Sequence, residues 1–220
     1  MSKEYKAIVF DLDGTLLDTL EDLWAAVNAT LDAYRMPLRS LEEVRAFVGN
    51  GIKNLMQRAV GREDFPDFDK LLEDFKRYYG AHCADCTKPY EGIIELLQAL
   101  KARGVHTAVL SNKADFATKK LAKEYFADLL EEAAGENEAA GIRKKPAPDA
   151  LFAMMERMGV SPAETVYVGD SEVDIQTAKN AGVDCISVTW GLRSKECLIE
   201  NGATVLLNTP MEILQYCERK

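Results

Sequence analysis

The chain has 220 residues, of which 47% are hydrophobic and 29% are charged. A compact chain of this length buries roughly 70% of the surface that its unfolded form exposes, so the composition excludes a mainly disordered protein. Asp and Glu number 36 against 27 Lys and Arg, which gives a formal net charge of −9. This excess of negative charge argues against a nucleic acid or an anionic membrane as the main partner.

The cysteine count and the N-terminal segment indicate the cellular compartment. Five cysteines do not make the even-numbered disulfide framework of small secreted proteins, and reduced thiols fit better. Only four apolar residues in a row precede Asp11, too few for a signal peptide, and no apolar run is long enough to span a membrane. We therefore expect a cytoplasmic protein, as a monomer or a homodimer.

Short apolar segments alternate with helical patterns along most of the chain. The predicted strands are 7–10, 107–110, 166–168, 185–188 and 205–207. Helical spacing of apolar residues is found at 91–103, 149–158 and 174–181. This alternation predicts an α/β fold with a parallel sheet. The polar, Ala- and Gly-rich stretch 131–143 receives no assignment.

The alternation is interrupted between the first two predicted strands, where an all-helical insert of about 65 residues is expected. Asp18–Glu21 and Ser40–Glu43 have the spacing of capping boxes at helix starts. Gly49-Asn50-Gly51 breaks the helical pattern within the insert. Two connections without strands, near 16–17 and 86–89, are expected to join the insert to the sheet.

Acidic residues follow the first predicted strand. Asp11 and Asp13 lie two apart in an extended segment, so both side chains should face the crevice beyond the carboxyl end of the sheet. Two close carboxylates repel each other, and a cation or a single proton relieves the repulsion. Gly14 permits a tight turn there. The alternative is an ordinary solvated turn, since Asp and Gly are common in turns.

Other strand ends carry complementary groups. Ser111 and Asn112 follow the second strand and precede a helix, a combination that suits an oxyanion. Asp170 and Asp174 follow the third strand on one face of a helix start, where N-capping is the alternative role.

Two lysines, Lys144 and Lys145, lie in a proline-stiffened approach to a helix, where a single lysine would more often be exposed. Carboxylates around a cation, with a lysine and a hydroxyl around an anion, predict a magnesium-phosphate site, because Mg²⁺ prefers oxygen ligands and keeps room for a substrate phosphate.

Four motifs in this order resemble those of the haloacid dehalogenase-like phosphatase superfamily. They are Asp11-Leu12-Asp13-Gly14-Thr15-Leu16, Ser111-Asn112-Lys113, Lys145-Pro146 and Gly169-Asp170-Ser171-Glu172-Val173-Asp174. The resemblance covers the whole chain and implies a Rossmann-like core of residues 1–15 and 86–220, with a helical cap of residues 16–85. Within the superfamily, the chain looks most like phosphoglycolate phosphatases. The segments that carry this resemblance are 111–113, 145–149 and, in the cap, 47–55.

The resemblance implies a Mg²⁺-dependent phosphomonoester hydrolase. In this pattern Asp11 is the nucleophile that forms an aspartyl-phosphate, and Asp13 is the general acid and then the general base. Asp11, Asp170 and the main-chain carbonyl of Asp13 would hold the metal. The substrate would be a small phosphorylated metabolite such as 2-phosphoglycolate.

Further roles follow from the same resemblance. Ser111, Asn112 and Lys145 would hold the phosphoryl oxygens, which makes Lys144 a bystander, and Asp174 would steady Lys145 or a metal-bound water. The residues Gly49, Asn50 and Gly51 of the cap precede a helix, so their free N–H groups could bind the anionic end of a substrate. The alternative for this segment is a plain turn between helices.

Three alternatives share parts of this pattern. A phosphatase for a sugar phosphate, a nucleotide or pyrophosphate would use the same site, and so would a β-phosphoglucomutase-like phosphomutase, which has to retain a phosphorylated intermediate. A non-enzymatic phospho-receiver domain also places acidic residues and a lysine at parallel strand ends. A receiver, however, needs no helical cap and has no use for a proton-transferring Asp13.

Overall fold

The computed structural model describes residues 5–62, 64–137, 141 and 143–218. The strands are β1 Ala7–Phe10, β2 Leu17–Asp18, β3 Lys88–Pro89, β4 His106–Ala114, β5 Glu132–Glu136, β6 Thr165–Gly169, β7 Asp184–Val188 and β8 Leu206–Leu207. The helices are α1 Leu20–Ala33, α2 Leu41–Phe47, α3 Gly51–Val60, α4 Phe68–His82, α5 Ile93–Ala102, α6 Asp115–Phe126, α7 Asp149–Met158, α8 Glu172–Ala181, α9 Lys195–Glu200 and α10 Pro210–Glu218.

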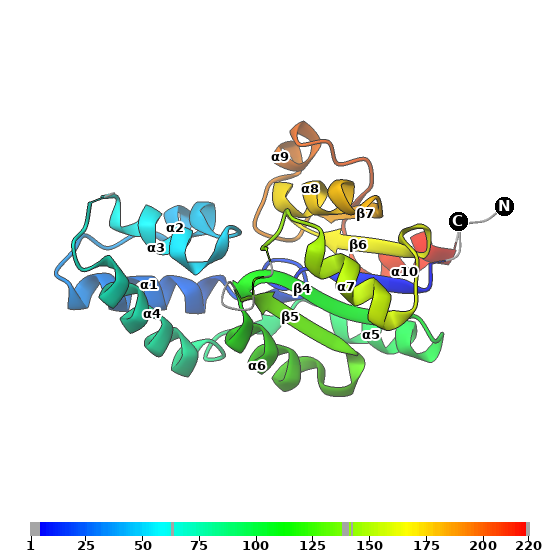
Figure 1. Cartoon of the computed structure of the whole chain (residues 1–220), viewed down its shortest axis with the longest axis horizontal. Helices are drawn as coiled ribbons and strands as arrows, with labels where there is room; N and C mark the ends of the chain where they lie inside the picture. The colour runs from blue at the N-terminus through cyan, green and yellow to red at the C-terminus, as the bar shows by residue number, and fades with distance from the viewer. Residues whose placement is uncertain (1–4, 63, 138–140, 142, 219–220) are drawn as a thin grey trace.

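A six-stranded sheet in the order β5-β4-β1-β6-β7-β8 forms the larger part of the molecule (Figure 1). Its neighbouring strands are all parallel, which confirms the predicted α/β fold. Side chains alternate across the strands, so Ile8 and Phe10 pack in one cluster with residues of α5 and α10. Val9 packs on the other face with residues of α7 and α8. The sheet is therefore covered on both faces.

The segment 131–143 contains an additional strand. Residues of β5 pair with β4 at the edge of the sheet, and the segment lacks the β-branched residues that usually mark a buried strand. Small residues are required there: a Cβ at Gly135 would lie 2.4 Å from the carbonyl oxygen of Lys113. Residues 138–140 and 142 of this segment lie outside the described residues.

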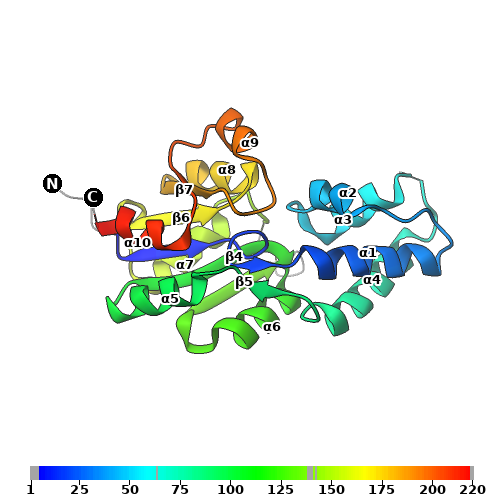
Figure 2. The same ribbon diagram turned by 180° about the vertical axis from the view of Figure 1, so that it is seen from behind.

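Helices α1–α4 form a separate helical layer beyond the carboxyl ends of the strands (Figures 1 and 2). Its apolar residues join the same cluster as one face of the sheet, through Leu16, Leu17 and Leu20. Ser40 and Glu43 form the predicted capping box of α2. The prediction at Asp18–Glu21 was wrong, since Thr19 is the N-cap of α1 and makes no side-chain capping bond.

The two connections to the helical layer are not strand-free as predicted. Leu17 pairs with Pro89 and Asp18 with Lys88 in a short antiparallel ribbon, β2–β3. The carboxylate of Asp22 accepts hydrogen bonds from the N–H groups of Cys86 and Thr87, which fixes the return connection to α1. Among the helices of the described residues, none is long and apolar enough to cross a membrane.

Candidate active site

A cavity of about 40 Å³ lies between the carboxyl ends of the strands and the helical layer. The sheet side contributes Asp11, Asp13, Ser111, Asn112, Lys113 and Asp170 to its lining. The helical layer contributes Leu23, Val48, Gly49, Gly51, Ile52 and Leu55. The topology explains this arrangement, because the carboxyl ends of parallel strands meet at one edge of the sheet.

Asp11 follows β1 directly and is buried in this cavity wall. Its Oδ1 accepts a hydrogen bond from the N–H of Leu12 at 2.7 Å and lies 3.0 Å from Nζ of Lys145. Burial raises the pKa of Asp11 to about 6, although the charge of Lys145 acts in the opposite direction. The side chain is thus fixed in orientation at the point where a ligand would enter.

Lys145 lies in the loop before α7 and its side chain is only 2% exposed. Besides Asp11, its Nζ contacts Oδ1 of Asp174 at 2.7 Å and the hydroxyl of Tyr167 at 2.9 Å. Burial alone would lower the pKa of Lys145, but the two carboxylates outweigh it and hold the pKa well above its usual value. Lys145 is therefore a fixed positive charge beside Asp11.

Asp174 serves two partners from the first turn of α8. Its Oδ2 accepts hydrogen bonds from the N–H and the hydroxyl of Ser171, completing a capping box, while Oδ1 contacts Lys145. The sequence offered N-capping and the steadying of the lysine as alternatives, and one carboxylate does both.

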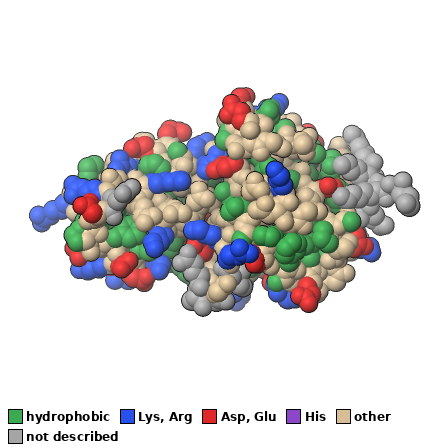
Figure 3. All heavy atoms as spheres, turned by 45° about the horizontal axis from the view of Figure 1, so that its top comes forward, with side chains coloured by type: hydrophobic (Ala, Val, Ile, Leu, Met, Phe, Trp, Pro, Cys, Tyr) green, Lys and Arg blue, Asp and Glu red, His purple; other side chains and the backbone are tan. Residues whose placement is uncertain are grey.

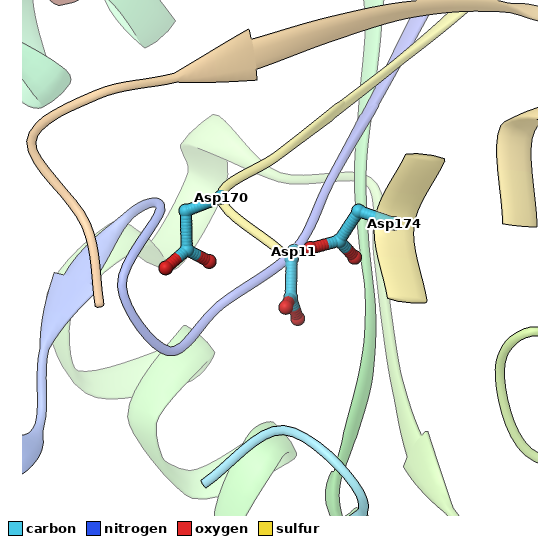
Figure 4. A group of neighbouring side chains, drawn as sticks. All are labelled: Asp11, Asp170 and Asp174. Carbon is cyan, nitrogen blue, oxygen red and sulfur yellow. The ribbon is translucent and has the colours of Figure 1, made fainter. Parts of the chain in front are cut away.

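Three buried carboxylates meet beside the cavity: Asp11, Asp170 and Asp174 have oxygen atoms within 4.8 Å of one another. Figure 4 shows Asp174 pointing toward Asp11, with Asp170 on the neighbouring loop. Burial, together with the carboxylates of Asp174 and Asp11, raises the pKa of Asp170 to about 8. Lys145 compensates only part of this negative charge, so the oxygen-rich cluster fits a divalent cation such as Mg²⁺.

Glycines make room for this cluster. A Cβ at Gly14, whose φ is +80°, would lie 2.3 Å from Oδ2 of Asp170. A Cβ at Gly191 would lie 2.4 Å from the same oxygen, and one at Gly169 would lie 2.2 Å from the carboxyl carbon of Asp174. Gly14 therefore does more than permit the predicted turn, because it also lets the Asp170 side chain approach the β1 loop.

Asp13 lines the same cavity but stands apart from the three carboxylates. Its Oδ1 accepts hydrogen bonds from the hydroxyl of Thr19 at 2.6 Å and from Nζ of Lys113 at 2.8 Å. Lys113 belongs to the Ser111-Asn112-Lys113 motif, but the sequence pattern alone does not indicate its contact with Asp13. The two aspartates that follow β1 thus have different surroundings: Asp11 is paired with Lys145, and Asp13 is paired with Lys113.

Ser111 and Asn112 lie at the carboxyl end of β4, as expected, and both are buried. The Asn112 side-chain amide donates to the carbonyl oxygens of Gly49 at 3.1 Å and Lys145 at 3.0 Å. Its donors are therefore taken by the loop of the helical layer and by the lysine loop. This contact was not foreseen, because the sequence alone does not show which backbone approaches an amide.

The Gly49-Asn50-Gly51 segment lies at the start of α3 and reaches the cavity through its two glycines. A lysine from the loop before α7 contacts this segment: Nζ of Lys144 donates to the carbonyl of Asn50 at 3.3 Å. A Cβ at Gly51 would lie 2.2 Å from a carboxylate oxygen of Glu136. A side chain at Gly51 would therefore displace the Glu136 carboxylate and strain the backbone, whose φ is +82°, so such a variant would not probe substrate choice alone.

Arg193, in the loop after β7, also joins the two parts of the molecule. Its guanidinium donates to the carbonyl oxygens of Val48 at 2.7 Å and Arg45 at 3.2 Å, and to Glu172 at 3.1 Å. Arg193 also lines the cavity, as the position of 190–193 after a predicted strand allows.

Acidic and basic side chains are interspersed over the face in Figure 3, which shows no continuous basic surface of the kind that binds nucleic acid.

Comparisons with known proteins show the family to which the chain belongs. Residues 8–188 match the profile of haloacid dehalogenase-like hydrolases. A phosphoglycolate phosphatase from Thiobacillus denitrificans is 37% identical over 84% of this chain and 84% of its own length. An N-acetylmuramic acid 6-phosphate phosphatase from Pseudomonas aeruginosa is 30% identical over 97% of this chain and 95% of its own.

A crystal structure of a protein from Lactobacillus delbrueckii subsp. bulgaricus superposes with a TM-score of 0.90. It is 36% identical in sequence, and the match covers 97% of this chain and 98% of that one. The chain therefore belongs to the haloacid dehalogenase-like hydrolases, as an enzyme of the phosphatase type that resembles phosphoglycolate phosphatases.

Proposed function

We propose that this protein is a Mg²⁺-dependent phosphomonoester hydrolase that acts through an aspartyl-phosphate on Asp11, with 2-phosphoglycolate as substrate. The observation that carries the proposal is the separation of the two aspartates after β1. Asp11 lies 3.0 Å from a buried lysine and beside two further carboxylates, whereas Asp13 faces the same cavity with its own lysine partner. Two carboxylates in different surroundings can take different roles in one reaction.

In the first half of the reaction, a carboxylate oxygen of Asp11 attacks phosphorus while the bond from phosphorus to the ester oxygen breaks. Asp13 gives its proton to the departing oxygen. Ser111, Lys145 and the main-chain N–H of Asn112 would hold the phosphoryl oxygens, since the Asn112 side-chain amide is engaged elsewhere.

In the second half, Asp13 takes a proton from a water that attacks the aspartyl-phosphate, which regenerates Asp11 and releases inorganic phosphate.

Asp11, Asp170 and the main-chain carbonyl of Asp13 would hold Mg²⁺, with Asp174 adjoining. When bound, the ion supplies positive charge between the Asp11 carboxylate and the phosphate, which would otherwise repel each other. Asp174 holds Lys145 through Oδ1 in the structure, which supports its assignment as a positioning residue.

The substrate assignment is supported by the relatives, among which a phosphoglycolate phosphatase is 37% identical over 84% of this chain. In this proposal residues 16–85 act as a cap over a core of residues 1–15 and 86–220, and they open and close about the β2–β3 ribbon. The free N–H groups of Gly49, Asn50 and Gly51 remain candidates for the anionic end of the substrate.

The proposal is tested by phosphate release from a panel of esters in the presence of Mg²⁺. The panel contains 2-phosphoglycolate, sugar phosphates, N-acetylmuramic acid 6-phosphate, nucleotides and pyrophosphate. We expect the highest kcat/KM for 2-phosphoglycolate. A higher value for another ester would replace the substrate but keep the reaction, and isomer formation from a sugar phosphate without phosphate release would identify a phosphomutase instead.

A further inference from the structure

A buried lysine lies at the junction between the sheet and the helical layer. Lys113, near the end of β4, has a side chain that is 1% exposed, and its carboxylate partner is Asp13. A buried charge is costly unless it is paired, so this contact constrains both side chains.

The contact holds Asp13 by one oxygen. Oδ1 accepts from Lys113 at 2.8 Å and from Thr19 at 2.6 Å, and among the described residues no hydrogen bond to Oδ2 is formed. Asp13 lines the cavity with its side chain 12% exposed. A carboxylate anchored through one oxygen can present the other to a ligand in a fixed direction.

The lysine is held in turn by the helical layer. Its Nζ lies 4.8 Å from the centre of the Tyr79 ring, a cation–π contact with a fully buried residue of α4. Tyr79 is itself fixed by stacking on Phe75, with ring centres 5.6 Å apart. The three groups therefore come from three places in the chain: the loop after β1, the end of β4, and a helix of the cap.

We propose that Lys113 is a positioning residue that fixes Asp13 for proton transfer to the leaving group, and that Tyr79 makes this positioning depend on closure of the cap. The inference rests on the proposed function, in which Asp13 is the general acid. When the cap moves away, the ring leaves Lys113 and the anchor of Asp13 loosens. Proton donation is then best aligned when the helical layer covers the substrate.

The inference makes a chemical prediction about leaving groups. The glycolate oxygen is a poor leaving group and needs a proton as its bond to phosphorus breaks, whereas p-nitrophenolate leaves without one. General acid catalysis contributes typically 10²–10⁴-fold, so misplacing the acid should selectively reduce kcat/KM for the poor leaving group. A variant that merely weakens the fold would reduce both values in proportion.

The experiment compares kcat/KM for 2-phosphoglycolate and p-nitrophenyl phosphate in four variants. Lys113→Met keeps most of the length of the side chain and removes the ammonium group, Tyr79→Leu removes the ring, and Asp13→Ala removes the acid. The matched control is Lys120→Met, because Lys120 also links the sheet side to α4, through a hydrogen bond to the carbonyl of Gly80 at 3.0 Å, but does not touch Asp13. Thermal unfolding checks that each variant is folded.

The ratio of interest is kcat/KM for 2-phosphoglycolate divided by kcat/KM for p-nitrophenyl phosphate. We expect Lys113→Met to lower this ratio on the order of tenfold, and Tyr79→Leu to lower it less. Lys120→Met should leave the ratio unchanged. If Asp13→Ala lowers the ratio but folded Lys113→Met and Tyr79→Leu do not, the positioning role is overturned while the proposed function stands. If Asp13→Ala also leaves the ratio unchanged, the acid role in the proposed function fails.

Discussion

Nζ of Lys145 lies 3.0 Å from Oδ1 of Asp11, although the two residues belong to distant parts of the sequence. Both side chains are buried, so the pair is shielded from water, and its electrostatic interaction is stronger than that of a surface ion pair. The ammonium group of Lys145 would also lie next to the oxygens of a phosphoryl group bound to Asp11.

The first prediction concerns this lysine. Lys145→Met should lower kcat/KM for 2-phosphoglycolate about 10²–10³-fold, because it removes a buried donor to the charge that develops in the transition state. Lys144→Met is the control, since that side chain is 32% exposed and its partners among the described residues are the carbonyl of Asn50 and Glu136, not Asp11. Steady-state kinetics of the two variants measure these losses. Comparable losses in kcat/KM would mean that Lys145 is not the lysine that contacts the phosphoryl group.

The metal assignment predicts an effect on stability as well as on activity. A ligand at a hundred times its Kd stabilises the folded protein by about 2.7 kcal/mol, so saturating Mg²⁺ should raise the melting temperature by roughly 5–10 °C. Asp170→Asn should remove this rise because it removes one charge of the carboxylate cluster.

Thermal unfolding with EDTA and with Mg²⁺ measures this effect. Asp149→Asn is a suitable control, since Asp149 is exposed and forms its ion pair within the described part of the chain with Arg143, away from the carboxylate cluster. An unchanged response to Mg²⁺ in Asp170→Asn, or full activity in excess EDTA, would rule out this metal site.

The glycine at the β1 loop provides a third prediction. Gly14→Ala should weaken Mg²⁺ binding, because its Cβ would meet Asp170 at 2.3 Å. Gly182→Ala is matched in backbone strain, with φ +68° against +80°, but its Cβ would have no neighbour within 4 Å. Both variants should lose roughly 1–2 kcal/mol of stability from the left-handed backbone, yet only Gly14→Ala should need more Mg²⁺ for half-maximal activity. If both variants reach half-maximal activity at a similar Mg²⁺ concentration, Gly14 has no part in metal binding.

The edge of the sheet that carries the candidate site could be predicted from the sequence because Asp11, Ser111 and Asp170 each follow a short apolar segment. Parallel strands bring their carboxyl ends together, so the order of strands need not be known to place Asp11, Ser111 and Asp170 near one another. The helical spacing in 20–82 likewise identified the insert without any knowledge of its contacts. These features depend on local patterns that the chain displays directly.

Other features depend on tertiary approach and could not be predicted. The strand β5 lacks an apolar pattern because its small residues fit against the start of α6 and the end of β4, as Gly135 shows. Tyr167 looked like an ordinary core residue of β6, yet its hydroxyl contacts Lys145. The contacts of Asn112 with Gly49, and of Arg193 with Val48, arise only when the helical layer meets the sheet.

The central claim is that the phosphoryl group passes through Asp11. The most direct measurement is acid quenching of the Asp13→Ala variant during turnover of p-nitrophenyl phosphate, followed by peptide mass spectrometry. Without Asp13 to activate water, hydrolysis of the intermediate should be slow, so we predict a phosphorylated peptide modified at Asp11, and none when Asp11→Asn is added. Phosphorylation at a different residue, or a phosphorylated peptide that persists in the double variant, would contradict the account.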